Sequence, residues 1–116
     1  MPDNSLIRSS IRLKVPLAKQ NEVIDILHSI SEQIKSEPDC IYAYLYRGVN
    51  DAEIIMFEEL WKNQNALNSH IRSRLYQRIL VAIEMSKKEP DIRFDKIIES
   101  RGFETLIHIR AGHNHK

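Results

Sequence analysis

The hydrophobic pattern of this chain switches repeatedly between the spacing typical of strands and that typical of helices, and this order constrains the fold more than any other feature. Residues 6–15 alternate apolar and polar side chains, the period of a half-buried strand. Residues 19–36 repeat apolar side chains at spacings of three and four, which predicts an amphipathic helix. Further strands are predicted over residues 40–49, 53–61 and 92–99, and further helical stretches from residue 63 and over residues 74–85.

The predicted elements follow the order β-α-β-β-α-β. This order predicts an α+β, ferredoxin-like fold, in which a four-stranded antiparallel sheet carries its helices on one face. We expect a single domain over residues 1–116, with a core of about residues 6–100 and a C-terminal extension over 101–116. The extension could cap the fold, cross to a second copy or be disordered, but its apolar side chains indicate that its first half packs against something; these are Phe103, Leu106, Ile107 and Ile109.

Composition excludes several classes of function. The net charge is +1, which gives no strong field for nucleic acid, and the third predicted strand is acidic and aliphatic, unlike an RNA-binding sheet. The longest aliphatic run, residues 79–83, is far too short to span a membrane, and residues 1–5 lack the features of a signal peptide. The single cysteine, Cys40, fits a reducing compartment. We therefore expect a cytoplasmic protein that binds neither membrane nor nucleic acid.

The second and third predicted strands are apolar on both faces. One face carries Tyr42, Tyr44 and Tyr46 with Ile54, Met56 and Leu60, and the other carries Ile41, Ala43 and Leu45 with Ile55, Phe57 and Trp61. Because the helices can cover only one face, a second copy of the chain is the simplest cover for the other. The pattern therefore predicts a face-to-face homodimer. The alternative is that the tyrosines simply suit a strand and tolerate water at their hydroxyl groups.

His70 and Trp61 are the first candidates for a functional site. His70 follows Leu67 by three residues, so it shares the sheet-facing side of its helix. An imidazole held against an apolar wall can act as a general base near neutral pH. Trp61 ends the preceding strand, and its indole N–H needs a partner if it is buried. Tyr76 follows nearly two helical turns after His70. A packing role for these side chains is the competing interpretation.

Other reactive side chains give weaker signals. His108, His113 and His115 lie near the C-terminus without a Cys or carboxylate at ligand spacing, so no metal site is predicted. Cys40 is expected to be a small buried residue and not a nucleophile, because no base accompanies it in the sequence.

The adjacent carboxylates Glu58 and Glu59 must point to opposite faces of their strand, so they cannot act as a pair. One of them should be buried, which is costly for an unpaired charge. We expect a structural ion pair with a partner such as Arg8 or Arg12.

The stretch from Phe57 to His70, with the sequence FEELWKNQNALNSH, resembles the signature of the antibiotic biosynthesis monooxygenase (ABM) domain. Ser73 and Tyr76 then follow the histidine at the spacing usual in that family. The resemblance covers roughly residues 6–100, and its specificity lies in the order and spacing of several degenerate motifs.

This resemblance implies a dimeric α+β barrel, in which two ferredoxin-like sheets pack face to face. Members of the family include oxygenases that act on quinols or polyketide phenols without metal or flavin, an isomerase and haem-degrading enzymes. Haem degradation is disfavoured, because the helix position of its histidine falls near Leu80 here and the first strand offers Ser9 and Ser10 in place of its asparagine.

The resemblance and the residues together predict a cofactor-independent monooxygenase acting on a quinol or another electron-rich aromatic molecule, with molecular oxygen as co-substrate and no metal. In this hypothesis His70 is the base and Trp61 a second catalytic residue. The expected substrate-binding residues are Tyr76, Tyr44, Tyr46 and Phe57. A non-catalytic dimeric module that binds a small apolar ligand, or an isomerase of the same family, is the alternative.

Overall fold

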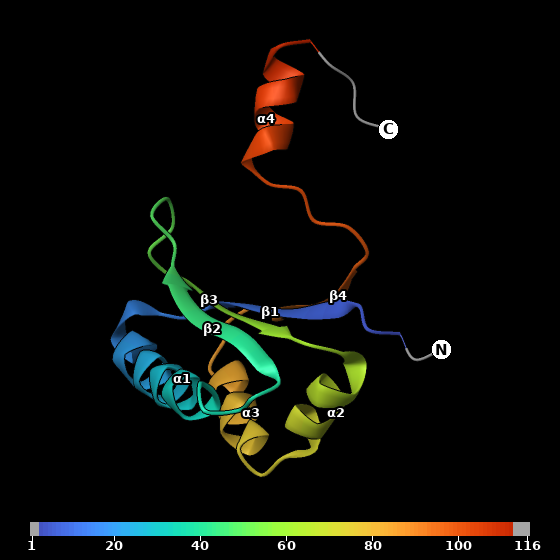
Figure 1. Ribbon diagram of the computed structural model, residues 1–116. Coiled ribbons are helices and arrows are strands. Elements are labelled where there is room, and N and C mark those ends of the chain that lie inside the picture. Colours follow the sequence, from blue (N-terminus) through green and yellow to red (C-terminus); the bar gives the residue numbers. More distant parts are fainter. Residues whose placement is uncertain (1–2, 113–116) are drawn as a thin grey trace.

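The computed structural model describes residues 3–112 and consists of a four-stranded antiparallel sheet with three helices packed on one face (Figure 1). Its elements are β1 (Leu6–Lys14), a 3-10 turn η1 (Leu17–Lys19), α1 (Gln20–Ile34), β2 (Cys40–Arg47), β3 (Ile54–Trp61), α2 (Gln64–Arg72), α3 (Tyr76–Glu84), β4 (Asp91–Ile97) and α4 (Phe103–Arg110). The strand order β2-β3-β1-β4 is that of a ferredoxin-like sheet, so the predicted fold class is confirmed.

The core lies between the sheet and the three helices. In β1, Ile7, Ile11 and Leu13 point to the helices and are buried, as the alternating sequence predicts. The helix α1 contributes a stripe of fully buried side chains at Val23, Leu27, Ile30 and Ile34. Burying each such aliphatic side chain stabilises the fold by about 1.5–3 kcal/mol.

The register of the central strands places a carboxylate in the middle of this apolar layer. Glu59 of β3 lies opposite Ser9 of β1 on one side and opposite Ala43 of β2 on the other. Both neighbours are small, which leaves room for the glutamate side chain beneath the helices. Glu59 is completely buried, so its charge needs partners within the protein.

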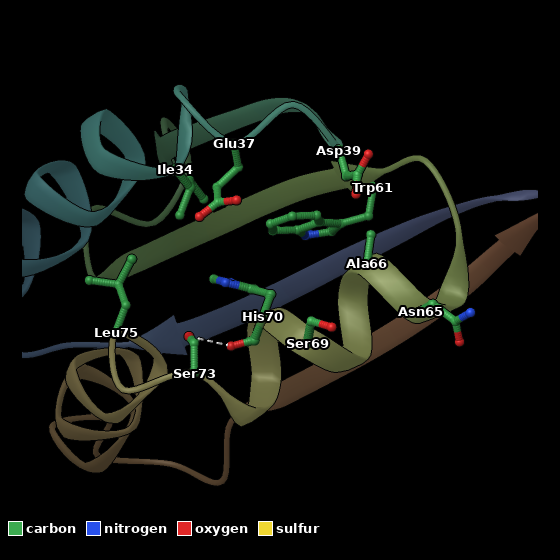
Figure 2. A pocket seen from close by; sticks show the side chains of 10 residues that line it. All are labelled: Ile34, Glu37, Asp39, Trp61, Asn65, Ala66, Ser69, His70, Ser73 and Leu75. Atoms are coloured by element: carbon green, nitrogen blue, oxygen red, sulfur yellow. Dashed lines mark hydrogen bonds between the residues drawn. The ribbon is translucent and has the colours of Figure 1, made fainter.

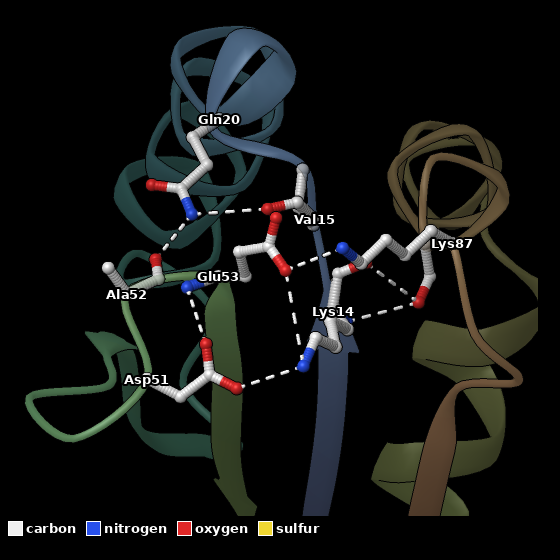
Figure 3. A network of polar contacts seen from close by, with 8 residues as sticks. Lys14, Val15, Gln20, Asp51, Ala52, Glu53 and Lys87 are labelled. Atoms are coloured by element: carbon white, nitrogen blue, oxygen red, sulfur yellow. Dashed lines mark hydrogen bonds and ion pairs between the residues drawn. The ribbon is translucent and has the colours of Figure 1, made fainter.

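A polar network closes the opposite end of the sheet, where β1 ends (Figure 3). Lys14 Nζ lies 3.0 Å from Asp51 Oδ2 and 4.0 Å from Glu53 Oε1, and Lys87 Nζ lies 2.6 Å from the same Glu53 oxygen. Gln20 donates from its side-chain amide to backbone carbonyls of two neighbouring segments. These contacts join β1, the β2–β3 connection and the segment after α3, so they stabilise the fold at this end of the sheet.

Within residues 3–112 no helix packs on the other face of the sheet. Tyr44 and Tyr46 project from it with 53% and 44% of their surface exposed, and Tyr42 stacks on Tyr44 at a ring-centroid distance of 5.0 Å. We call this surface the tyrosine face; it also includes Met56 and Leu60, which pair with the tyrosine strand, and Ile54, which lies on the same side of β3. The sequence prediction that both faces of these strands are apolar is thus confirmed.

The helix α4 extends away from the sheet on the same side as the tyrosine face (Figure 1). None of its residues is buried, and Phe103 is 73% exposed. The radius of gyration is accordingly 16.6 Å, against about 13 Å for a compact chain of this length. Residues 103–110 therefore form a helix, but their own chain does not cover their apolar side chains.

Candidate active site

The buried Glu59 is paired with His70. His70 Nε2 lies 2.8 Å from Glu59 Oε2, and the histidine is only 6% exposed. An ionised carboxylate accepts hydrogen bonds only, so it favours the tautomer in which Nε2 carries the proton. Nδ1 then carries a lone pair, and among the described residues no hydrogen-bond partner occupies it. This is the arrangement of an imidazole oriented by a carboxylate.

Two aromatic rings, those of Trp61 and Tyr76, pack against the His70 imidazole. Trp61 stacks on His70 with ring centroids 4.6 Å apart, and its indole Nε1 donates to Glu59 Oε1 at 3.4 Å. Tyr76 presents its ring edge-on to His70 at 5.2 Å. Burial, with a smaller effect of the Glu59 charge, raises the pKa of Tyr76 to about 12, so this phenol stays protonated at neutral pH. The imidazole is therefore fixed in position and orientation.

The expected ion pair of the buried glutamate with an arginine is wrong. Arg8 lies on the tyrosine-face side of β1 and pairs with Asp95 at 3.8 Å, while Glu58, on the same side, accepts a hydrogen bond of 2.7 Å from Tyr42. The physical reason is strand parity: Arg8 and Arg12 point away from the face on which Glu59 lies. The spacing of Glu59 two residues before Trp61 could have placed both on the helix face.

The position of His70 follows from how α2 begins and ends. The side chain of Asn63 caps the helix by accepting a hydrogen bond of 2.8 Å from the Ala66 N–H. Ser73 leaves helical geometry and its hydroxyl donates to the His70 carbonyl at 2.6 Å. The two helical stretches predicted from residue 63 and over residues 74–85 are therefore separate helices, α2 and α3, and His70 occupies the last turn of α2.

A cavity of about 290 Å³ opens beside this cluster (Figure 2). Its lining residues come from the end of α1, the loop before β2, the end of β3 and the helix α2 with the segment after it: Ile34, Glu37, Asp39, Trp61, Asn65, Ala66, Ser69, His70, Ser73 and Leu75. The volume is that of a pocket for a small molecule. The buried His70 and Trp61 form part of its wall, so a bound ligand would meet the imidazole directly.

The structure separates the remaining predicted site residues. Tyr76 touches the far side of His70 but does not line the cavity, and Phe57 is a fully buried core residue. Tyr44 and Tyr46 lie on the tyrosine face, across the sheet from the cavity. Sequence reasoning did not select Glu37, Asp39, Asn65 or Ser69, because nothing in the spacing of these polar residues distinguishes them from ordinary surface positions.

Cys40 is half-buried at the start of β2, and burial, followed by the charges of Glu59 and Glu37, raises its pKa to about 11. Only the thiolate is nucleophilic, so we expect alkylation by iodoacetamide at pH 8 to be about 100-fold slower than for a cysteine with the ordinary pKa of 9.0. The rate should rise tenfold per pH unit up to about pH 11. Mass spectrometry of the single cysteine measures this, and a rate equal to that of a free cysteine would contradict it.

Residues 3–112 contain no group of three or more His, Cys, Asp or Glu side chains arranged to hold a metal ion. His113 and His115 lie outside the described residues. Within the described part of the chain, no helix has both the length and the apolar character needed to cross a membrane.

Comparison with known proteins identifies the family. Residues 7–81, about two thirds of the chain, match the family model "Antibiotic biosynthesis monooxygenase". The chain belongs to the ABM family. The match includes β1, β3 and the helix α2, and therefore Glu59, Trp61 and His70.

Solved structures support the ABM fold. A conserved protein from Methanosarcina mazei is 28% identical, with a TM-score of 0.74 over 80% of this chain and 93% of that one. A Bacteroides thetaiotaomicron protein, described as a possible oxidoreductase, is 18% identical, with a TM-score of 0.75 over 82% and 100% of the two chains. A structure named antibiotic biosynthesis monooxygenase is 14% identical, with a TM-score of 0.71 over 80% and 99%. At the two lower identities the likeness establishes the fold alone.

One curated relative is the uncharacterized protein sll1783 from Synechocystis, which is 27% identical over 90 residues. The matched region is 77% of this chain but 61% of the relative, so the chain corresponds to less than two thirds of that protein.

Proposed function

We propose that this ABM-family chain is a monooxygenase that oxidises a small electron-rich phenol or hydroquinone with molecular oxygen and without a metal or organic cofactor. The observation that carries the proposal is the Glu59–His70 pair: its imidazole lies in the wall of a small-molecule cavity, and its Nδ1 has no hydrogen-bond partner among the described residues. A phenol gives electrons to oxygen readily only after it loses its proton, so the reaction needs a positioned base.

The proposed reaction begins when His70 Nδ1 takes the phenolic proton, and Glu59 stabilises the resulting imidazolium through the other ring nitrogen. The phenolate gives one electron to oxygen, and the two radicals combine to form a carbon–oxygen bond at the ring. The hydrogen on the oxygenated ring carbon then moves to the distal peroxide oxygen. The O–O bond breaks, hydroxide leaves, and the electrons of the former C–H bond form a carbonyl at that ring carbon. The hydroxide takes the proton from His70 and departs as water.

This scheme converts one hydroquinone and one oxygen molecule into one hydroxyquinone and one water. The substrate supplies all four electrons, so no external reductant is required. The hydroxyl of Ser69 lines the cavity one residue before His70 and is the candidate hydrogen-bond donor to the phenolate oxygen. Trp61 provides a flat apolar wall for the ring of the substrate.

Oxygen consumption by metal-stripped protein with a panel of hydroquinones tests this proposal. We expect uptake above autoxidation, one ¹⁸O atom in the product and one in water, and a loss of at least 100-fold in the variant His70→Ala. The matched control is His28→Ala, which removes an exposed histidine on α1 that does not line the cavity. Uptake by His70→Ala equal to wild type, or no uptake with any substrate, would contradict the oxygenase and favour a ligand-binding module.

We also propose that two copies associate through their tyrosine faces. The exposed rings of Tyr44 and Tyr46 on an uncovered sheet support this, since an apolar sheet face is usually covered by another layer. The tyrosine face spans the edge strand β2 and its neighbour β3, and a two-fold related copy can pack on it with the same residues. In this arrangement α4 of each chain would lie beside the second copy, because it extends from the same side of the sheet.

A further inference from the structure

The mouth of the cavity is negatively charged. Glu37 and Asp39 line it, and its ten lining residues include neither lysine nor arginine. Within residues 3–112 neither carboxylate forms an ion pair. Figure 2 shows Glu37 and His70 on opposite walls, with their side chains directed into the same space. Both carboxylates therefore line the cavity that a ligand of His70 would occupy.

The loop that carries these two side chains is fixed by the backbone. The Glu37 N–H donates to the Ile34 carbonyl at 3.0 Å, and the Glu37 carbonyl accepts from Cys40 at 3.1 Å. The Asp39 carbonyl accepts from the Lys62 N–H at 2.9 Å, which ties the loop to the end of β3. The carboxylates are thus held beside the cavity and do not depend on a freely moving loop.

The interior of the cavity adds to this field. Glu59 lies beneath the His70 ring and is completely buried. The same charges act on the Cys40 thiol: after burial, the charges of Glu59 and Glu37 are the next largest causes of its raised pKa. His70 itself is more than nine-tenths buried and lines the cavity, and among residues 3–112 its only side-chain hydrogen bond is the one with Glu59.

We propose that the cavity selects aromatic ligands by charge, binding phenols with a cationic substituent most tightly, neutral phenols less tightly, and phenols with a carboxylate or phosphate least. This inference concerns the substrate class of the site and rests on the proposed function for its catalytic meaning, although binding alone can test it. The cationic group would lie between Glu37 and Asp39, while the ring contacts Trp61 and the hydroxyl group faces His70.

Trp61 is the single tryptophan of the chain and lines the cavity, so its fluorescence reports ligand binding there. Three catechols of similar size and different charge serve as anaerobic probes: dopamine, 4-methylcatechol and 3,4-dihydroxyphenylacetate. Each exposed carboxylate should change affinity about threefold per unit of ligand charge, by Coulomb's law at a few ångströms in water. We therefore expect Kd to rise about tenfold from dopamine to the neutral catechol and about tenfold again to the anion.

The double variant Glu37→Gln, Asp39→Asn should bring the three Kd values to within about threefold of one another. The control Asp25→Asn removes an exposed carboxylate of α1 outside the cavity and should preserve the order. Raising the ionic strength from 0.05 to 0.5 M should also compress the differences, because the Debye length falls from about 13 to about 4 Å.

Equal affinities for the three probes, a reversed order, or no quenching by any of them at millimolar concentration would overturn the inference. The result is separable from the proposed oxygenase activity, because no turnover is needed. A charge-dependent order without oxygen uptake would support the pocket's selectivity while contradicting the oxygenase. Oxygen uptake together with equal Kd values for the three probes would support the oxygenase and contradict the charge selectivity.

Discussion

Replacing Glu59 with glutamine is expected to lower oxygen consumption by about 100- to 1,000-fold while the protein stays folded. The glutamine amide can point its NH₂ group at His70 Nε2, which would then have to act as the acceptor. The imidazole proton would move to Nδ1, the nitrogen that the proposed mechanism needs as a base. An amide in place of an orienting carboxylate also leaves the imidazolium without its counter-charge.

Two measurements separate this positioning role from a structural one. The ¹⁵N NMR spectrum of the histidines should show the Nε2–H tautomer of His70 in the wild type and the Nδ1–H tautomer in Glu59→Gln. The matched control is Glu58→Gln, one residue along the strand, where the glutamine can still accept the hydrogen bond from Tyr42. Full activity and an unchanged tautomer in Glu59→Gln would remove Glu59 from the mechanism.

The variant Glu59→Ala adds a stability readout to the same prediction. It leaves the His70 and Trp61 N–H groups without their buried acceptor, and each buried donor left unsatisfied costs about 1–3 kcal/mol. For a domain of this size we expect Tm to fall by about 10–20 °C. A drop of less than about 3 °C by calorimetry would indicate that the pair contributes little to the fold.

Placing one charge in the tyrosine face is expected to convert a dimer into monomers. In a two-fold interface the substitution Tyr44→Asp introduces two carboxylates, one from each copy, into an apolar contact. Burial of each unpaired charge costs several kcal/mol, so the dimer dissociation constant should rise by at least 1,000-fold.

Analytical ultracentrifugation checks this prediction. The wild type should sediment at twice the 13.6 kDa of one chain, and Tyr44→Asp at that mass. The control Leu80→Asp changes a side chain of similar exposure, 42%, on the helical side of the molecule, and should leave the dimer intact. A monomeric wild type, or a Tyr44→Asp variant with the wild-type mass, would rule out association through this face.

The sequence by itself determined the order of the elements, because the spacing of apolar residues differs between a strand and a helix and can be read locally. The same periodicity put His70 on the sheet-facing side of its helix and Tyr42, Tyr44 and Tyr46 on a separate face from Phe57 and Trp61. Strict use of that alternation would also have placed Tyr44 and Tyr46 on the opposite side of the sheet from His70.

Only the tertiary structure decided which groups meet. Strand parity gives the face of Glu59 but not its partner, since that depends on where α2 folds back over the sheet. The sequence analysis therefore predicted an arginine as the partner of the buried glutamate. In the structure α2 begins at the Asn63 cap and ends at Ser73, and this placement of the helix brings His70 to the carboxylate. Glu37 and Asp39 reach the same cavity from a distant loop, and no local pattern records such a contact, because it is fixed by packing between segments far apart in the chain.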